Sequence, residues 1–191
     1  MPPPAIILIG ARCTGKTTVA RWLADQLGYP YVDVDEWVET QAGKTVAEIF
    51  ATEGETGFRN RESAALQQIC SAGPRVIATG GGVVLREANR RLIRSTGLVV
   101  WLTATPERLW ERLQRDPATA SRRPNLTATG GLEEIRALLT HREPLYREIA
   151  DLVISTETLS PEAVADAILS AWTGGNISRW SSGACLSSSP G

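Results

Sequence analysis

A glycine-bounded loop near the N-terminus carries the first residues whose types and spacing suggest chemistry. Residues 10–17 read Gly-Ala-Arg-Cys-Thr-Gly-Lys-Thr and satisfy the pattern G-x-x-x-x-G-K-[ST] at every fixed position. Glycines let such a loop turn its N–H groups inward around phosphate oxygens, and the N-terminus of a following helix adds positive potential. The pattern predicts a phosphate-binding loop, in which these residues contact the nucleotide: Arg12, Cys13, Thr14, Gly15, Lys16, Thr17 and Thr18.

Two side chains of this loop have distinct expected tasks. The ammonium group of Lys16 is expected to reach the β- and γ-phosphates of ATP, and the hydroxyl of Thr17 is expected to bind Mg²⁺. The alternative is a glycine-rich turn with a surface lysine. A buried strand before the loop and an amphipathic helix after it favour the phosphate loop.

Two carboxylates separated by one residue follow the second short apolar run. Asp33 and Asp35 come directly after Tyr31-Val32, so both side chains can emerge beside the phosphate loop. One carboxylate can orient the water shell of Mg²⁺, while the other accepts a hydrogen bond, and can take the proton, from a substrate hydroxyl. A solvated turn with two helix-capping aspartates remains the alternative at this point.

An arginine and three consecutive glycines could form the other side of such a site. Arg59 and Glu62 are three residues apart on a predicted helix, so the glutamate can brace the guanidinium as a fork for a carboxylate. A surface ion pair is the alternative. Gly80, Gly81 and Gly82 follow a predicted strand, and such a run is tolerated where a ligand approaches the backbone closely. A plain tight turn would also accommodate them.

The elements that must position these groups alternate along the chain. Short, continuous apolar runs predict buried strands at 5–9, 31–32, 75–78, 98–102 and 152–154. Helical periodicity predicts helices over 19–27, most of 36–69 with interruptions around Gly43 and Gly54, a segment starting at Pro106, 132–149 and 161–172. This alternation predicts an α/β fold, with a parallel sheet covered by helices on both faces.

The length of 191 residues fits one compact domain, which we predict over residues 1–172. Residues 115–131 are rich in Pro, Thr, Gly and Arg without periodicity, so a long loop is expected there, either a functional lid or a disordered segment. Residues 173–191 are dominated by Ser and Gly. They are expected to be a disordered tail, to which we assign no function.

Composition excludes several classes of partner. The formal net charge of −1 gives no global basic field, so we expect neither a nucleic-acid nor a membrane partner. Three cysteines, Cys13, Cys70 and Cys185, fit neither a zinc site nor a disulfide framework. The first residues lack the basic region and the length of a signal or membrane segment. These features together predict a cytoplasmic protein, and a monomer is the default expectation.

The ordered set of motifs resembles the shikimate kinase family. It comprises the loop 10–17, Asp33-Val34-Asp35, Phe58-Arg59, Gly80-Gly81-Gly82, Arg123-Pro124 and Arg142-Glu143-Pro144-Leu145-Tyr146, and it spans roughly residues 5–172. The family is similar to nucleoside monophosphate kinases in fold. The resemblance therefore implies a three-layer α/β/α P-loop kinase with a five-stranded parallel sheet. It also implies a substrate-binding helical region at 34–62 and a lid at 115–131.

The same resemblance implies transfer of the γ-phosphoryl group of ATP, with Mg²⁺, to the 3-hydroxyl of shikimate in aromatic amino-acid biosynthesis. It makes Asp35, Lys16 and Arg123 the catalytic residues, with Arg123 in the lid also binding ATP. It implies that the metal lies beside Thr17 and Asp33. It also implies that shikimate is held by Asp35, by the backbone of the three glycines and by two arginines that face its carboxylate: Gly80, Gly81, Gly82, Arg59 and Arg142.

Two details differ from the family pattern or leave a choice open. Ser155 stands where the family often has an acidic residue, so no adenine contact is predicted in the loop 154–161. Arg122 adjoins Arg123 and could share its role.

Two other functions remain open from the residues alone. One is a kinase of another small metabolite such as gluconate, and the other is a non-catalytic nucleotide-binding module.

Overall fold

The computed structural model describes residues 5–115 and 130–173. Arg122, Arg123, most of the predicted lid and nearly all of the predicted tail lie outside the described residues, so these expectations stay predictions.

Five parallel strands form a single sheet, as predicted. They are β1 (Ala5–Ile9), β2 (Tyr31–Asp33), β3 (Arg75–Ala78), β4 (Leu98–Thr103) and β5 (Leu152–Ser155). Their order across the sheet is β2-β3-β1-β4-β5. Strand β1 is central because it pairs with β3 on one side and with β4 on the other, Ile7 lying opposite both Ile77 and Val99.

The described helices lie between and after these strands. They are α1 (Lys16–Leu27), α2 (Val34–Ala42), α3 (Val46–Ser71), the short 3-10 helix η1 (Val83–Leu85), α4 (Glu87–Thr96), α5 (Pro106–Arg115), α7 (Gly131–Ile149) and α8 (Pro161–Thr173). The backbone of α3 is interrupted at Gly54, close to the predicted break. No helix in 5–115 or 130–173 is long and apolar enough to cross a membrane.

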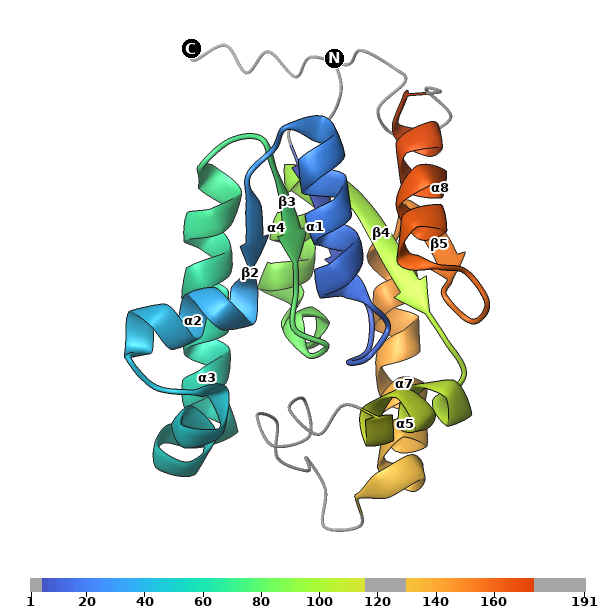
Figure 1. Ribbon diagram of the computed structural model, residues 1–191. Coiled ribbons are helices and arrows are strands. Elements are labelled where there is room, and N and C mark those ends of the chain that lie inside the picture. The colour runs from blue at the N-terminus through green and yellow to red at the C-terminus, as the bar shows by residue number, and fades with distance from the viewer. Residues whose placement is uncertain (1–4, 116–129, 174–191) are drawn as a thin grey trace, which may run out of the picture.

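Alternation along the central strand creates two apolar layers. Ala5, Ile7 and Ile9 of β1 belong to the core cluster that α2, α3, α4 and α7 cover. Ile6 and Leu8 point the other way, into the cluster covered by α1 and α8. Because both faces are covered, β1 is apolar at every position, as expected for a parallel strand. The result is the predicted α/β/α arrangement, with α1 and α8 on the near face in Figure 1.

The parallel topology brings the predicted site residues to one edge of the sheet. The phosphate loop follows β1, the two aspartates follow or end β2, and the three glycines follow β3. In open α/β sheets the carboxyl ends of the strands form the crevice where ligands bind. The segments 10–15, 33–35 and 80–82, which are far apart in the chain, therefore meet at one place.

Candidate active site

The phosphate loop has a backbone that only certain residues permit. Gly10 has φ 136°, and a Cβ there would overlap the carbonyl oxygen of Leu102. Cys13 has φ 63°, a left-handed conformation that is uncommon for a residue other than glycine. No side chain caps the N-terminus of α1. Its first N–H groups are therefore oriented for an anion, as the sequence pattern predicts.

Lys16 lies across this loop. Its Nζ donates hydrogen bonds to the carbonyl oxygens of Gly10, at 2.9 Å, and Ala11, at 2.6 Å. The side chain is buried at the base of a pocket, here called the nucleotide pocket, whose lining includes Arg12, Cys13, Gly15, Lys16, Thr17, Thr18, Asp33 and Asp35. Thr14, also predicted to contact the nucleotide, is buried and donates its hydroxyl hydrogen to Ala11.

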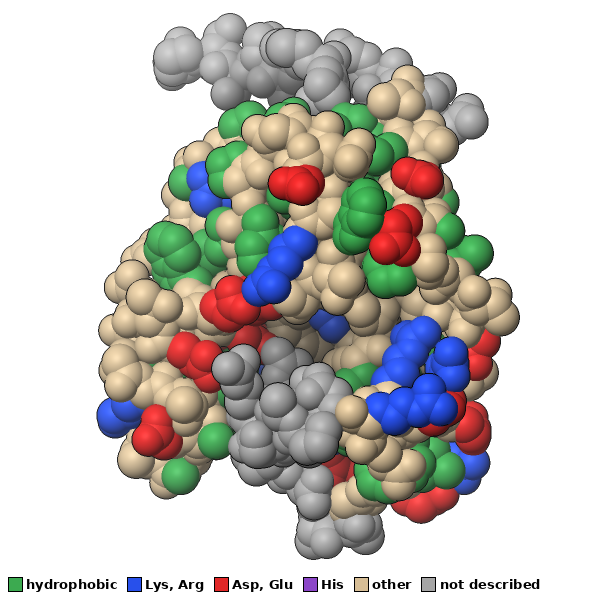
Figure 2. All heavy atoms as spheres, viewed as in Figure 1, with side chains coloured by type: hydrophobic (Ala, Val, Ile, Leu, Met, Phe, Trp, Pro, Cys, Tyr) green, Lys and Arg blue, Asp and Glu red, His purple; other side chains and the backbone are tan. Residues whose placement is uncertain are grey.

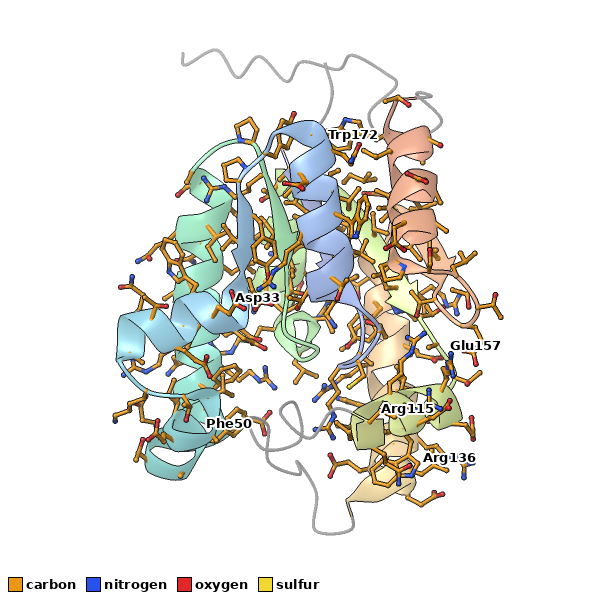
Figure 3. The ribbon with its side chains drawn as sticks, in the orientation of Figure 1. Asp33, Phe50, Arg115, Arg136, Glu157 and Trp172 are labelled. Carbon is orange, nitrogen blue, oxygen red and sulfur yellow. The ribbon has the colours of Figure 1, made fainter. Side chains whose placement is uncertain are left out.

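Asp33 performs the capping role that the sequence left open, and it also faces the phosphate loop. Its Oδ1 accepts hydrogen bonds from the backbone N–H groups of Asp35 and Glu36, which caps α2. Its Oδ2 accepts a hydrogen bond of 3.0 Å from the Thr17 hydroxyl. Asp33 ends β2, whereas Asp35 lies in the first turn of α2, so only the first belongs to the strand end where we expected both. Figure 3 shows Asp33 at this junction.

The side chains beside Thr17 suit a magnesium ion held partly by nucleotide phosphates. Thr17 and Asp33 supply two adjacent hard oxygen atoms at the mouth of the phosphate loop. Within the described part of the chain, no cluster of three or more His, Cys, Asp or Glu side chains could hold a metal ion. Mg²⁺ is commonly bound by one or two protein oxygens together with phosphates and water, so this donor set fits it.

A second pocket adjoins the nucleotide pocket and contains the predicted acceptor-binding residues. Its lining includes Asp35, Arg59, Glu62, Gly80, Gly81, Gly82 and Arg142, and it is called the acceptor pocket below. Asp35 lines both pockets, as do Arg12, Cys13 and Val46. The carboxylate of Asp35 is therefore placed where a group bound in one pocket would meet a group bound in the other.

Arg59 is held by two glutamates of its own helix. Its Nη1 donates a hydrogen bond of 2.9 Å to Glu62, as predicted, and its Nη2 donates one of 3.3 Å to Glu55. The Glu62 side chain is fully buried, and this burial raises its pKa to about 7 although Arg59 opposes the shift. The guanidinium is thus pre-oriented within the acceptor pocket, and the surface ion-pair alternative is excluded for this arginine.

The glycine run lies against these charged side chains. A Cβ at Gly80 would lie 2.7 Å from Asp35 Oδ1 and 3.0 Å from Glu62 Oε1. A Cβ at Gly82 would overlap the guanidinium of Arg59. Neither glycine has a positive φ, so space, rather than backbone conformation, requires glycine at both positions. The side chains that approach this backbone closely belong to the protein itself, so close approach of a ligand to the glycines stays a prediction.

Helix α7 supplies the second arginine and a support for the glycines. Arg142 is mostly buried in the acceptor pocket, and burial lowers the pKa of its guanidinium. One turn further on, the Tyr146 hydroxyl donates a hydrogen bond to the carbonyl oxygen of Gly81. Burial raises the pKa of Tyr146 to about 12, so the hydroxyl keeps the proton that it donates at neutral pH. Tyr146 thereby fixes the glycine segment beside Arg142.

The remaining wall of the acceptor pocket is apolar. The rings of Phe50 and Phe58 lie 4.8 Å apart between centroids, and both line the pocket. Leu109 and Leu113 of α5 line it as well. Figure 3 shows Phe50, from α3, and Arg115, at the end of α5, on the left and right of the lower half of the view. A ligand here would contact hydrophobic groups on its flanks and charged groups at its base.

The sequence analysis missed Arg112, a structural link at the nucleotide pocket. Its Nη1 donates hydrogen bonds to the carbonyl oxygen of Cys13, at 3.2 Å, and to the Thr156 hydroxyl, at 3.0 Å. It thus ties α5 to the phosphate loop and to the segment after β5. Lys and Arg side chains gather beside the hollow near α5 in Figure 2. Arg112 is one of several arginines on this helix, and no pattern in the sequence distinguishes it from Arg108 or Arg115.

Sequence comparison identifies relatives over almost the whole described chain. The model of the family described as shikimate kinase matches residues 12–173. The chain is 47% identical over 169 residues to a shikimate kinase of Rhodopirellula baltica, covering 88% of this chain and 90% of that protein. It is 48% identical over 159 residues to shikimate kinase 2 of Dickeya chrysanthemi, covering 83% and 90%, respectively.

Comparison with solved structures identifies the same family as the sequence comparison. The fold matches that of a shikimate kinase from Acinetobacter baumannii, solved in complex with shikimate, with a TM-score of 0.85 and 37% sequence identity. The match covers 92% of this chain and 96% of the other. The phosphate loop, the aspartates, the braced arginine and the glycine run thus occur in a chain that is similar to these enzymes over nearly its full length. The chain belongs to the shikimate kinase family.

Proposed function

We propose that this chain transfers the γ-phosphoryl group of ATP to the 3-hydroxyl of shikimate. The observation that carries the proposal is the position of Asp35, which lines both the nucleotide pocket and the acceptor pocket. A hydroxyl held by this carboxylate in the acceptor pocket would face the terminal phosphate of a nucleotide in the other. Such alignment provides much of the catalysis in phosphoryl transfer, because the transition state is loose.

The acceptor pocket suits a small, carboxylated ring. Arg59 and Arg142 are two buried guanidinium groups that can bind one carboxylate with hydrogen bonds. The backbone of Gly80, Gly81 and Gly82 lies beside them, and the two phenylalanine rings offer an apolar flank for a ring. A non-catalytic nucleotide-binding module would not need this second pocket.

In the proposed mechanism, each described residue has a defined task. The N–H groups of the phosphate loop and the ammonium of Lys16 bind the phosphates and stabilise the charge of the transferring group. Lys16 must exchange its carbonyl partners in the loop for phosphate oxygens when ATP binds. The carboxylate of Asp35 orients the acceptor hydroxyl and receives its proton.

Thr17 and Asp33 are the proposed residues at the magnesium ion. Mg²⁺ supplies positive charge that neutralises the phosphate oxygens during transfer. Asp33 already accepts the Thr17 hydroxyl hydrogen, so both oxygen atoms are held in place beside the loop. Arg123, outside the described residues, is proposed to cover the phosphates. Exclusion of water there would reduce wasteful ATP hydrolysis.

The test is ADP release measured with shikimate, with gluconate and without an acceptor. We expect rapid release with shikimate only. Equal release with gluconate would favour the kinase of another metabolite, and no acceptor-dependent release would favour a nucleotide-binding module. Either result would overturn the proposal.

The proposal also includes a monomeric enzyme in the cytoplasm. Size-exclusion chromatography with light scattering should give one species near 20.6 kDa. Cell fractionation should recover the protein with cytoplasmic markers. A larger species would contradict the monomer, and recovery with membranes would contradict the cytoplasmic location. Neither result would contradict the proposed kinase activity.

A further inference from the structure

The guanidinium of Arg12 lies in a position that the phosphate-loop pattern does not specify. Arg12 occupies a variable position of the loop, and it lines both the nucleotide pocket and the acceptor pocket. Its side chain is largely buried, and Nη2 donates a hydrogen bond to Oε1 of Glu134 on α7. A cation is therefore anchored on the wall that the two pockets share.

The partner of Arg12 shows which end of the acceptor pocket this cation occupies. Glu134, Leu138 and Arg142 recur every four residues, so they lie along one face of α7. Eight residues of helix separate Glu134 from Arg142 by roughly 12 Å along the axis. The Arg12 side chain, paired with Glu134, thus reaches the start of α7, about two turns before Arg142, while its backbone belongs to the phosphate loop.

We propose that Arg12 is a further catalytic residue, whose guanidinium binds the transferring phosphoryl group, and that Glu134 is its positioning residue. The inference rests on the proposed function. During transfer, the bond from the γ-phosphorus to the β–γ bridging oxygen breaks, and a bond from the acceptor oxygen forms. The bridging electron pair leaves with ADP, and the hydroxyl proton passes to Asp35. Negative charge on the transferring group then lies between the two pockets, where Arg12 is placed.

Arg12 has the capacity for this contact. A guanidinium has five N–H donors, and the bond to Glu134 is its one side-chain hydrogen bond to a described residue. The Glu134 side chain is fully buried, so its charge requires a partner. Arg12 can satisfy Glu134 with one edge and present its other donors to phosphate oxygens. A purely structural pair, which only ties the loop to α7, would leave turnover unchanged once the protein is folded.

Steady-state kinetics with Mg²⁺-ATP and shikimate separate these readings. The main variant is Arg12→Met with Glu134→Gln, because removing both charges leaves no buried charge unpaired. We expect its kcat to fall about 100-fold, with the shikimate KM and the ADP Kd each changing less than about threefold. Glu134→Gln alone should lower kcat about tenfold, because the guanidinium loses its anchor. Arg12→Lys keeps the charge but not the fork, and it should also lower kcat about tenfold.

The matched control is an exposed arginine–glutamate pair on α7, formed by Arg136 and by Glu133, the neighbour of Glu134. Arg136→Met with Glu133→Gln removes an ion pair of 2.7 Å on the solvent side, and it should leave kcat within about twofold. A kcat within twofold of wild type in the double Arg12 variant would overturn the inference. If the double variant does not fold, a kcat of Arg12→Lys within twofold of wild type would overturn the inference instead. A loss confined to the shikimate KM would also overturn it, because it would place Arg12 at the carboxylate.

Failure of the proposed function would look different. It would appear as the absence of shikimate-dependent ADP release in the wild-type protein. An active wild type with an unaffected Arg12 variant would defeat only the inference about Arg12.

Discussion

Nη1 of Arg59 lies 2.9 Å from Oε2 of Glu62, and the two side chains are 9% and 0% exposed, respectively. The guanidinium is therefore oriented before any ligand arrives, because a charge-assisted hydrogen bond in a buried site fixes its plane. The second glutamate on Arg59, Glu55, is 59% exposed and contacts it from the solvent side at 3.3 Å. One arginine thus has a buried and an exposed carboxylate partner, and the two can be tested separately.

Glu62→Gln should weaken shikimate binding without affecting ATP. At pH 8, above the Glu62 pKa of about 7, the carboxyl is charged, so the amide keeps the shape of the side chain but removes the charge that orients Arg59. We expect the shikimate KM to rise about tenfold, equivalent to about 1.4 kcal/mol, with the ATP KM unchanged. Glu55→Gln is the control, and its exposed pair should be worth less than a threefold change in KM. Equal effects of both changes would contradict the buried-brace explanation.

The buried Glu62 should also make stability depend on pH. Burial raises its pKa from 4.5 to about 7, so between these values the folded state holds a proton that the unfolded state releases. Its contribution to the free energy of unfolding is therefore fully present below pH 4.5 and is lost as the pH rises through about 7. Glu62→Gln should gain stability relative to wild type by on the order of 2 kcal/mol between pH 5 and 8.

Urea unfolding of both proteins at several pH values measures this difference. The Glu55→Gln variant should follow the wild-type pH dependence. A stability difference between Glu62→Gln and wild type that does not change with pH would show that the carboxyl titrates normally.

Lys16→Met should nearly abolish turnover. Its ammonium is the proposed stabiliser of charge on the phosphates, and loss of such a group typically lowers kcat by about 100- to 1,000-fold. Lys44→Met is the matched control, because Lys44 is exposed and lies 3.9 Å from Glu53 on the surface. Its kcat should match wild type. Wild-type turnover in Lys16→Met would contradict the phosphate-loop assignment.

Two changes at Asp33 should separate its capping role from its proposed metal role. Asn caps a helix as well as Asp does, so Asp33→Asn should keep stability while raising the Mg²⁺ concentration for half-maximal activity about tenfold. Asp33→Ala should raise it similarly and also lower the free energy of unfolding by about 1 kcal/mol. Magnesium titrations and urea unfolding measure the two effects. An unchanged Mg²⁺ requirement in both variants would remove Asp33 from the metal site.

The five strands and most of the helices were predictable because local patterns determine them. A central parallel strand must be apolar on both faces, so Ala5–Ile9 is identifiable without its neighbours. The helix breaks at Gly43 and Gly54 were predicted from glycine alone, and both have positive φ. The position of Asp35 was less clear. A spacing of two residues suits a shared strand end, but capping by Asp33 begins α2 before Asp35.

The contacts that join distant segments were not predictable from these patterns. Arg112 meets Cys13 across 99 residues, and Arg12 meets Glu134 across 122. Other arginines lie near both in the sequence. Only the packing of α5 and α7 against the phosphate loop determines that Arg112 and Arg12 make these contacts. Arg59 and Glu62, by contrast, share one helix turn, so their spacing alone predicted the pair.

Product analysis tests the central claim most directly. The purified protein should be incubated with ATP, Mg²⁺ and shikimate, and the product examined by phosphorus–proton correlation NMR. If Asp35 aligns the 3-hydroxyl with the γ-phosphate, one phosphate ester on carbon 3 should form, in equal amount to ADP. Release of ADP with inorganic phosphate alone, or an ester on another hydroxyl, would contradict the proposed alignment.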